Sequence, residues 1–238
     1  IDRRGIQAAG SISRERLATA CRYLIGQAPA CDTALIAFLG DFFHTDSYRA
    51  VTPQHGHLLD SDVRYPKMVE LGYDMVIYAI EAALEKHKDV HVIFEKGNHD
   101  ASTASVVAIT LKRHFGNNPR VHVDTSPAWF HYFQFGKVAL ATNHGDKVKP
   151  GGLLQVMAAD QPKMWGDTTY RMFMTGHVHH ESRKEYPGGF VETFGILAPS
   201  DAFAAIGGWR SICQMHALTL HKDGYLANFW RSVQQDPE

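Results

Sequence analysis

The chain has 238 residues, of which 45% are hydrophobic and 21% charged, with 24 basic and 25 acidic side chains. The formal net charge of -1 excludes a protein that holds nucleic acid by standing basic charge alone. No run of about eighteen apolar residues occurs, which excludes a transmembrane helix and leads us to expect a cytoplasmic chain without membrane contact. Three dispersed cysteines exclude a disulfide framework and a CxxC zinc site, and predict reduced, buried thiols.

The first half of the chain alternates helix and strand patterns. Apolar residues at helical spacing predict helices over residues 13–27, 67–86 and 102–114. Continuous apolar runs predict strands over residues 34–39 and 90–94, and a short strand follows at 121–123. The first of these runs has the pattern of an interior strand that is buried on both faces.

The second half of the chain is dominated by closely spaced strands. They are predicted over residues 129–135, 138–142, 170–175, 182–186 and 190–194, and a terminal hairpin pairs 215–221 with 225–230. No repeat, linker or low-complexity tract divides the sequence, so we expect a single domain over residues 1–238. The order of elements predicts an α/β (α+β) fold in which a mixed sheet is layered with helices.

Four predicted strands end in short segments that combine glycine with metal-ligating side chains. These segments are Gly40-Asp41-Phe42-Phe43-His44, Gly97-Asn98-His99-Asp100, Asn143-His144-Gly145-Asp146 and Gly176-His177-Val178-His179-His180. Ligand sites in layered sheets gather outside the carboxyl ends of strands, so the four segments can converge. Carboxylate, amide and imidazole groups suit divalent manganese, iron, zinc or nickel rather than a thiolate-bound structural zinc. The set is too large for one ion and indicates two.

The ordered series GD, GNHD, HG and GHVH, from Gly40 to His179, resembles the calcineurin-like metallophosphoesterase superfamily. The string from Gly40 to His44 is similar to that of the DNA-repair-nuclease branch. The resemblance implies a four-layer β-sandwich with mixed sheets, flanked by helices. It also implies a centre of two divalent ions, with Mn²⁺ expected and iron, zinc or nickel as alternatives.

The same resemblance implies a role for each site residue. Asp41 would bridge the two ions, and His179 would help to bind the first of them. The second ion would be bound by Asn98, His144 and His177. His99 would act as general acid or charge stabiliser, Asp100 would orient its ring, and His44 would contact the substrate. The polar loop over residues 45–66 would either contact substrate as well or be an ordinary solvated loop.

One family motif has no counterpart in its usual place. Family members carry Asp-x-His at the end of their first strand, and nothing before Gly40 has this form. Asp89-Val90-His91 does have it, but this segment starts a predicted strand, so it points to the opposite end of the sheet. Because the chain begins with Ile1 rather than methionine, we expect the domain to lack its first strand and the motif to lie upstream. The alternative is a true loss, which leaves Asp41 and His179 as the ligands of the first ion.

The function that follows from this resemblance is hydrolysis of a phosphoester, with a hydroxide held between two ions attacking phosphorus in line. A phosphodiesterase or DNA nuclease is expected. The alternatives are a phosphomonoesterase or small-molecule phosphodiesterase and, from a different class, a non-catalytic scaffold with a degenerate metal site. The expected partner is a phosphoester substrate, with DNA as one candidate, and no protein partner is indicated. Nucleophilic serine, Walker-type and dinucleotide-binding motifs are absent.

Overall fold

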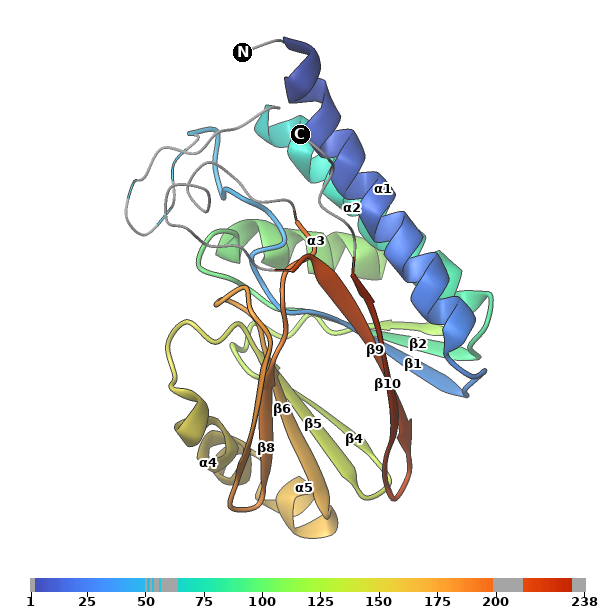
Figure 1. Cartoon of the computed structure of the whole chain (residues 1–238), viewed down its shortest axis with the longest axis vertical. Coiled ribbons are helices and arrows are strands. Elements are labelled where there is room, and N and C mark those ends of the chain that lie inside the picture. The colour runs from blue at the N-terminus through green and yellow to red at the C-terminus, as the bar shows by residue number, and fades with distance from the viewer. Residues whose placement is uncertain are drawn as a thin grey trace.

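The computed structural model describes residues 3–49, 51, 53, 56, 64–198 and 212–232 (Figure 1). Its helices are α1 (Arg3–Gln27), α2 (Tyr65–Leu84), α3 (Ala101–His114), α4 (Pro150–Asp160) and α5 (Pro162–Asp167). Its strands are β1 (Thr33–Phe38), β2 (Asp89–Phe94), β3 (Val121–Val123), β4 (His131–Phe135), β5 (Val138–Asn143), β6 (Tyr170–Thr175), β7 (Ser182–Tyr186), β8 (Gly189–Thr193), β9 (Gln214–His221) and β10 (Gly224–Ser232). None of the helices in these ranges is both long and apolar enough to cross a membrane. The sequence did not predict α4 and α5, and most of the polar loop over 45–66 lies outside the described residues.

The first sheet is parallel and has the order β1-β2-β3, with α2 and α3 as the crossover helices. Its core joins Val76 and Ile80 of α2 and Leu111 of α3 to Val92 and Phe94 of β2. Because β1 and β2 are parallel and in register to their last residues, the loops that follow them leave the same edge of the sheet.

The second sheet is mixed and has the order β4-β5-β6-β8-β7. Its three central strands are parallel, whereas β4 and β7 run antiparallel to their neighbours. The helices α4 and α5 cover one face, where Leu153, Met157 and Met164 pack against Phe173. The loops after β5 and β6 therefore also leave from one edge.

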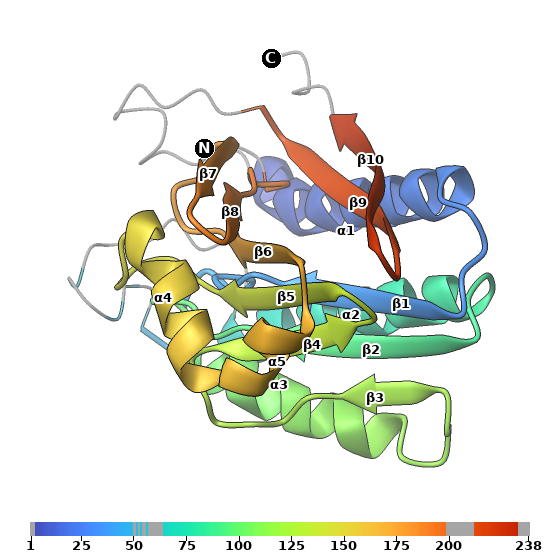
Figure 2. The ribbon, with the colours of Figure 1, turned by 90° about the horizontal axis from the view of Figure 1, so that it is seen from below.

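The two sheets face each other through a shared apolar layer (Figure 2). Leu140 and Met172 of the second sheet pack with Leu35 of β1 and Leu218 of β9. The layers are thus α2 and α3, the first sheet, the second sheet, and α4 with α5. This arrangement confirms the predicted α/β (α+β) sandwich with mixed sheets and flanking helices.

Strand β1 differs from its prediction as an interior strand buried on both faces. It is the edge strand of its sheet, and all six of its residues are partly exposed. Strand β9 pairs with β10 alone, so each of β1 and β9 has one edge that no strand of the described residues joins. Helix α1 links them from one side, since Leu17 and Cys21 belong to a cluster that also contains Phe38 and Met215. The apolar sequence of β1 is therefore less covered here than its pattern predicts.

The three cysteines are free, but they differ in exposure. Cys21 and Cys213 are buried, whereas Cys31 is partly exposed, which corrects the prediction that all three are buried. Burial raises the pKa of Cys21 to about 11 and also raises the pKa of Cys213, so both thiols resist ionisation. We expect a thiol reagent such as Ellman's at pH 8 to label Cys31 rapidly and the other two only after denaturation. Rapid labelling of more than one thiol per chain, or rapid labelling of the Cys31→Ser variant, would contradict this prediction.

Candidate metal centre

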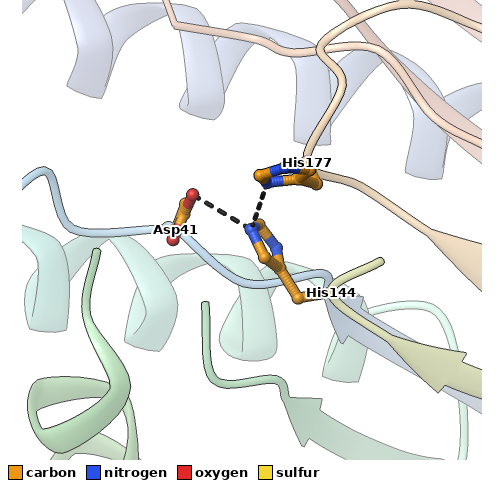
Figure 3. Close-up of side chains that lie close together, drawn as sticks. All are labelled: Asp41, His144 and His177. Carbon is orange, nitrogen blue, oxygen red and sulfur yellow. Dashed lines mark hydrogen bonds and ion pairs between the residues drawn. The ribbon is translucent and has the colours of Figure 1, made fainter. Parts of the chain in front are cut away.

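Four side chains from the two sheets converge on one point. Asp41 follows β1, Asn98 follows β2, His144 follows β5 and His177 follows β6. The Nε2 atom of His144 lies 3.0 Å from Oδ2 of Asp41 and 3.1 Å from Nδ1 of His177 (Figure 3). It also lies 3.0 Å from Oδ1 of Asn98. The structure therefore brings together the bridging residue and all three ligands that were predicted for the second ion.

The atoms that meet at this point are mostly hydrogen-bond acceptors. The Nδ1 atom of His144 lies 2.8 Å from the carbonyl oxygen of Leu39, and an N–H donor there leaves Nε2 with a lone pair. That lone pair faces a carboxylate oxygen of Asp41 and the amide oxygen of Asn98. A proton, a hydrogen-bond donor such as water, or a metal cation satisfies such a group, and mixed oxygen and imidazole donors suit a divalent transition ion. The residues present thus fit the metal that the sequence implies.

Burial and neighbouring charges shift the pKa values of these groups in different directions. Burial alone would raise the pKa of Asp41, but the hydrogen bond and charge of His144 bring that pKa below its usual value. Burial alone would lower the pKa of His144, and its contact with Asp41 raises it instead. Burial and the charge of His144 lower the pKa of His177. A carboxylate and a neutral imidazole are the ligand forms that a cation needs, and it would displace the proton shared by His144.

The loop backbones are bent sharply to aim these side chains. Asp41, His177 and His179 all have positive φ, at 53°, 69° and 59°, which is uncommon for residues other than glycine. Two glycines make room for the convergence. A Cβ at Gly40 would lie 2.5 Å from Nδ1 of His144, and a Cβ at Gly97 would lie 1.9 Å from Oδ1 of Asp41. Side chains at these two positions would push the ligands apart.

Asp100 joins the two loops of the first sheet through their backbones. Its fully buried carboxylate accepts N–H groups from Gly97 at 2.9 Å, Phe43 at 3.0 Å and Asp41 at 3.2 Å. Burial raises the pKa of Asp100 to about 6, against the effect of these donors. The prediction that Asp100 orients the ring of His99 is wrong, because backbone N–H groups surround its carboxylate instead. Its role is to hold Asp41 and the loop of Asn98 in place.

His99 and His44 lie side by side next to this point. The backbone N–H of His99 donates to Oδ1 of Asp41 at 2.8 Å, and Nδ1 of its ring lies 3.2 Å from the carbonyl oxygen of His44. The two rings stack with centroids 5.9 Å apart and planes at 27°. His44 is exposed and His99 partly so. This placement is consistent with the predicted roles of His99 at the reacting group and His44 at the substrate.

The ligands predicted for the first ion are not gathered in the same way. His179 is exposed and lies two residues beyond His177, outside the group formed by Asp41, His144 and His177. Asp89 and His91 lie at the start of β2, and the ring of His91 stacks on that of His122 at 4.5 Å. This Asp-x-His is at the far end of the strand from Asn98, as the sequence predicts.

Two acidic residues that support the site were missed by the sequence analysis. Glu95 is buried between the sheets, where it accepts the Nδ1–H of His131 at 2.9 Å and the hydroxyl of Thr142. Asp46 accepts the N–H groups of Ser102 at 2.9 Å and Thr103 at 2.7 Å at the start of α3. Glu95 did carry a signal, because a charged residue directly after a buried apolar strand needs a partner.

Comparisons with known proteins give weak similarities only. No family model matches the chain, and no curated protein matches it. A single mutant of Vps29 from Entamoeba histolytica is 16% identical, with 85% of this chain and 99% of that chain covered and a TM-score of 0.38. Wild-type Vps29 from the same organism, complexed with Zn²⁺, is 15% identical over 84% and 98%, with a TM-score of 0.37. A conserved uncharacterized protein from Streptococcus pneumoniae TIGR4, described as a predicted phosphoesterase, is 8% identical over 84% and 97%, with a TM-score of 0.34. Similarities at this level carry no argument about activity.

Proposed function

We propose that this chain is a metal-dependent phosphoester hydrolase that acts on a phosphodiester. The observation that carries the proposal is the group formed by Asp41, Asn98, His144 and His177, whose acceptor atoms meet within about 3 Å of Nε2 of His144. His99 lies directly beside it and is tied to Asp41 through its backbone. A divalent cation bound there would supply positive charge that stabilises the phosphoryl and leaving oxygens of an in-line displacement.

The chain's own residues would position the substrate and transfer one proton to the leaving group. Because Nδ1 of His99 lies beside the carbonyl oxygen of His44, the other ring nitrogen, Nε2, would face the leaving oxygen of the ester and transfer a proton to it. Asp100 keeps the two loops in register through three backbone N–H groups, so that His99 and Asp41 do not move independently. His44 extends the site toward solvent beside His99, where a second ester substituent of a diester would lie. DNA is the substrate that we propose first, on the similarity of the string from Gly40 to His44.

We propose that Asp41 would be shared between this ion and the first ion, for which His179 would be one ligand and an Asp-x-His motif would supply the others. The edge of β1 that no strand of the described residues joins supports the proposal, because its backbone groups could pair with a strand that ends in this motif. The partial exposure of every residue in β1 supports it as well. Manganese is the metal proposed, with iron, zinc and nickel as the alternatives for this donor set.

The proposal is tested by metal analysis followed by turnover of three substrates. We expect the chain to bind Mn²⁺ and to hydrolyse bis(p-nitrophenyl) phosphate and single-stranded DNA faster than p-nitrophenyl phosphate, with loss of turnover in EDTA. Faster turnover of the monoester would favour the phosphomonoesterase. Bound metal without turnover of any of the three would favour the non-catalytic scaffold.

His99→Ala separates chemistry from metal binding. We expect it to lower kcat about 10²–10⁴-fold, because proton transfer to the leaving group is lost, while Mn²⁺ affinity stays within about twofold. His122→Ala is the matched control, since that ring is half exposed on β3 and stacks on His91 at the other end of the first sheet. Equal turnover in the two variants would remove His99 from the mechanism.

A further inference from the structure

A second group of ligating side chains lies between the second sheet and the terminal hairpin. It consists of Glu181, just before β7, Glu192 in β8 and His216 in β9, and their ligating atoms all lie within 4.8 Å of one another. Glu192 lies beside Met174 in the pairing of β8 with β6, and His177 is three residues beyond Met174. The group is therefore distinct from the centre at Asp41 in its residues.

His216 is held in the form that binds a cation. Its side chain is only 5% exposed, and its Nδ1 lies 3.3 Å from Oδ1 of Asn228 on β10. A proton on Nδ1 donates to that oxygen, so Nε2 carries a lone pair. Nε2 is buried without a hydrogen-bond partner among the described residues and lies 3.9 Å from Oε2 of Glu181. Metal-bound histidines use one ring nitrogen in this way while the other donates to an oxygen.

Glu192 brings a second unsatisfied atom to the same place. Its side chain is 3% exposed, and no residue in the described part of the chain forms a hydrogen bond with Oε2. The guanidinium of Arg183 is 3.6 Å from that oxygen and also lies over the ring of Phe190. Glu181 adds a second carboxylate, so the single positive charge of Arg183 leaves one negative charge uncompensated. The two orphaned polar atoms are buried, whereas the Glu181 side chain beside them is 47% exposed, so a cation could enter from the side of Glu181 and satisfy both atoms.

We propose that Glu181, Glu192 and His216 form a site for a divalent transition ion, and Zn²⁺ is the probe because it binds both carboxylate and imidazole ligands. Three protein ligands leave a coordination position for water or for the side-chain oxygen of Gln214, whose Nε2 is already 2.9 Å from Glu181. The ion would connect β8 to β9 and so fasten the hairpin to the second sheet. Its role would be to stabilise the fold.

The test isolates this site from the centre at Asp41. In the Asp41→Asn/His144→Ala background, titration calorimetry should find about one Zn²⁺ per chain, and adding His216→Ala or the isosteric Glu192→Gln should weaken that binding more than about 100-fold. His221→Ala, a half-exposed histidine on the same strand, is the matched control and should leave Zn²⁺ binding unchanged. In the otherwise unaltered chain, Glu192→Gln should lower the Zn²⁺ stoichiometry by one and lower the Tm measured with Zn²⁺.

Either of two results would overturn the proposal. The Asp41→Asn/His144→Ala variant binds no Zn²⁺, or its Zn²⁺ affinity is unchanged by both His216→Ala and Glu192→Gln. Failure of the hydrolysis assays does not bear on it, because the readout is metal binding without the centre at Asp41. Conversely, an absent second site leaves the proposed hydrolase untouched. If the double background does not fold, the stoichiometry of the unaltered chain and of Glu192→Gln decides the question alone.

Discussion

Asp41→Asn is expected to weaken Mn²⁺ binding more than about 100-fold and to abolish phosphodiester turnover at micromolar Mn²⁺. Removing a residue that only supports a metal ligand costs about 10–100-fold in metal affinity, and Asp41 is itself a proposed ligand at the point where Asn98, His144 and His177 meet. The substitution removes the negative charge but little else. An amide oxygen can still accept the N–H of His99, and asparagine tolerates the positive φ of this residue.

The variant should therefore fold, which makes the loss of metal interpretable. Circular dichroism and thermal melting check the fold, and titration calorimetry with Mn²⁺ measures the loss. Asp167→Asn is the matched control, because that carboxylate is on the surface helix α5 and pairs only with Lys163. If Asp41→Asn binds Mn²⁺ as tightly as this control does, Asp41 is not a ligand and the proposed function falls with it.

Glu95→Ala is expected to lower the free energy of unfolding by about 3–5 kcal/mol, the effect of removing one partner of a buried ion pair. Glu95 is 1% exposed, and it links β2 of the first sheet to His131 of β4 and Thr142 of β5 in the second. Without it, two buried polar side chains lose their partner. Urea denaturation measures the change, and Glu185→Ala on the exposed strand β7 should cost less than about 0.5 kcal/mol. A loss of similar size in both variants would show that Glu95 is not a structural link.

The same pair gives the protein a pH-dependent component of stability. Burial alone would lower the pKa of His131, but the hydrogen bond and charge of Glu95 raise it above its usual value of about 6.5. The stabilisation is complete below the pKa of the unfolded imidazole and is lost as pH rises through the raised pKa of the folded state. The difference in stability between wild type and Glu95→Gln should therefore be larger at pH 6 than at pH 9. A difference that grows with pH would contradict the raised pKa.

The sequence predicted the parts of the fold that depend on local pattern. The apolar periods of α2 and α3 and the apolar runs of β2 and β5 set both element type and position. The helices α4 and α5 were missed. Their apolar residues, Leu153, Met157 and Met164 among them, are buried by the second sheet rather than arranged by a strong helical period of their own. Tertiary burial of that kind is not readable from a local window.

The sequence predicted which residues form the candidate site, but it did not predict the contacts that hold them in place. Glycine-flanked ligands at four strand ends were enough to indicate that Asp41, Asn98, His144 and His177 meet. The direction of the Asp100 carboxylate depends on where three backbone N–H groups of two separate loops lie, and no spacing in the sequence encodes that. Glu95 depends in the same way on His131, which is 36 residues away along the chain.

The left-handed backbone at Asp41, His177 and His179 also bears on how this protein could be engineered. Each such residue costs of the order of 1–3 kcal/mol, which glycine at the same position would recover. A library selected for thermal tolerance alone would therefore accumulate glycine at these positions and lose the side chains that converge there. At these three positions, a gain in melting temperature is a sign that ligation has been lost.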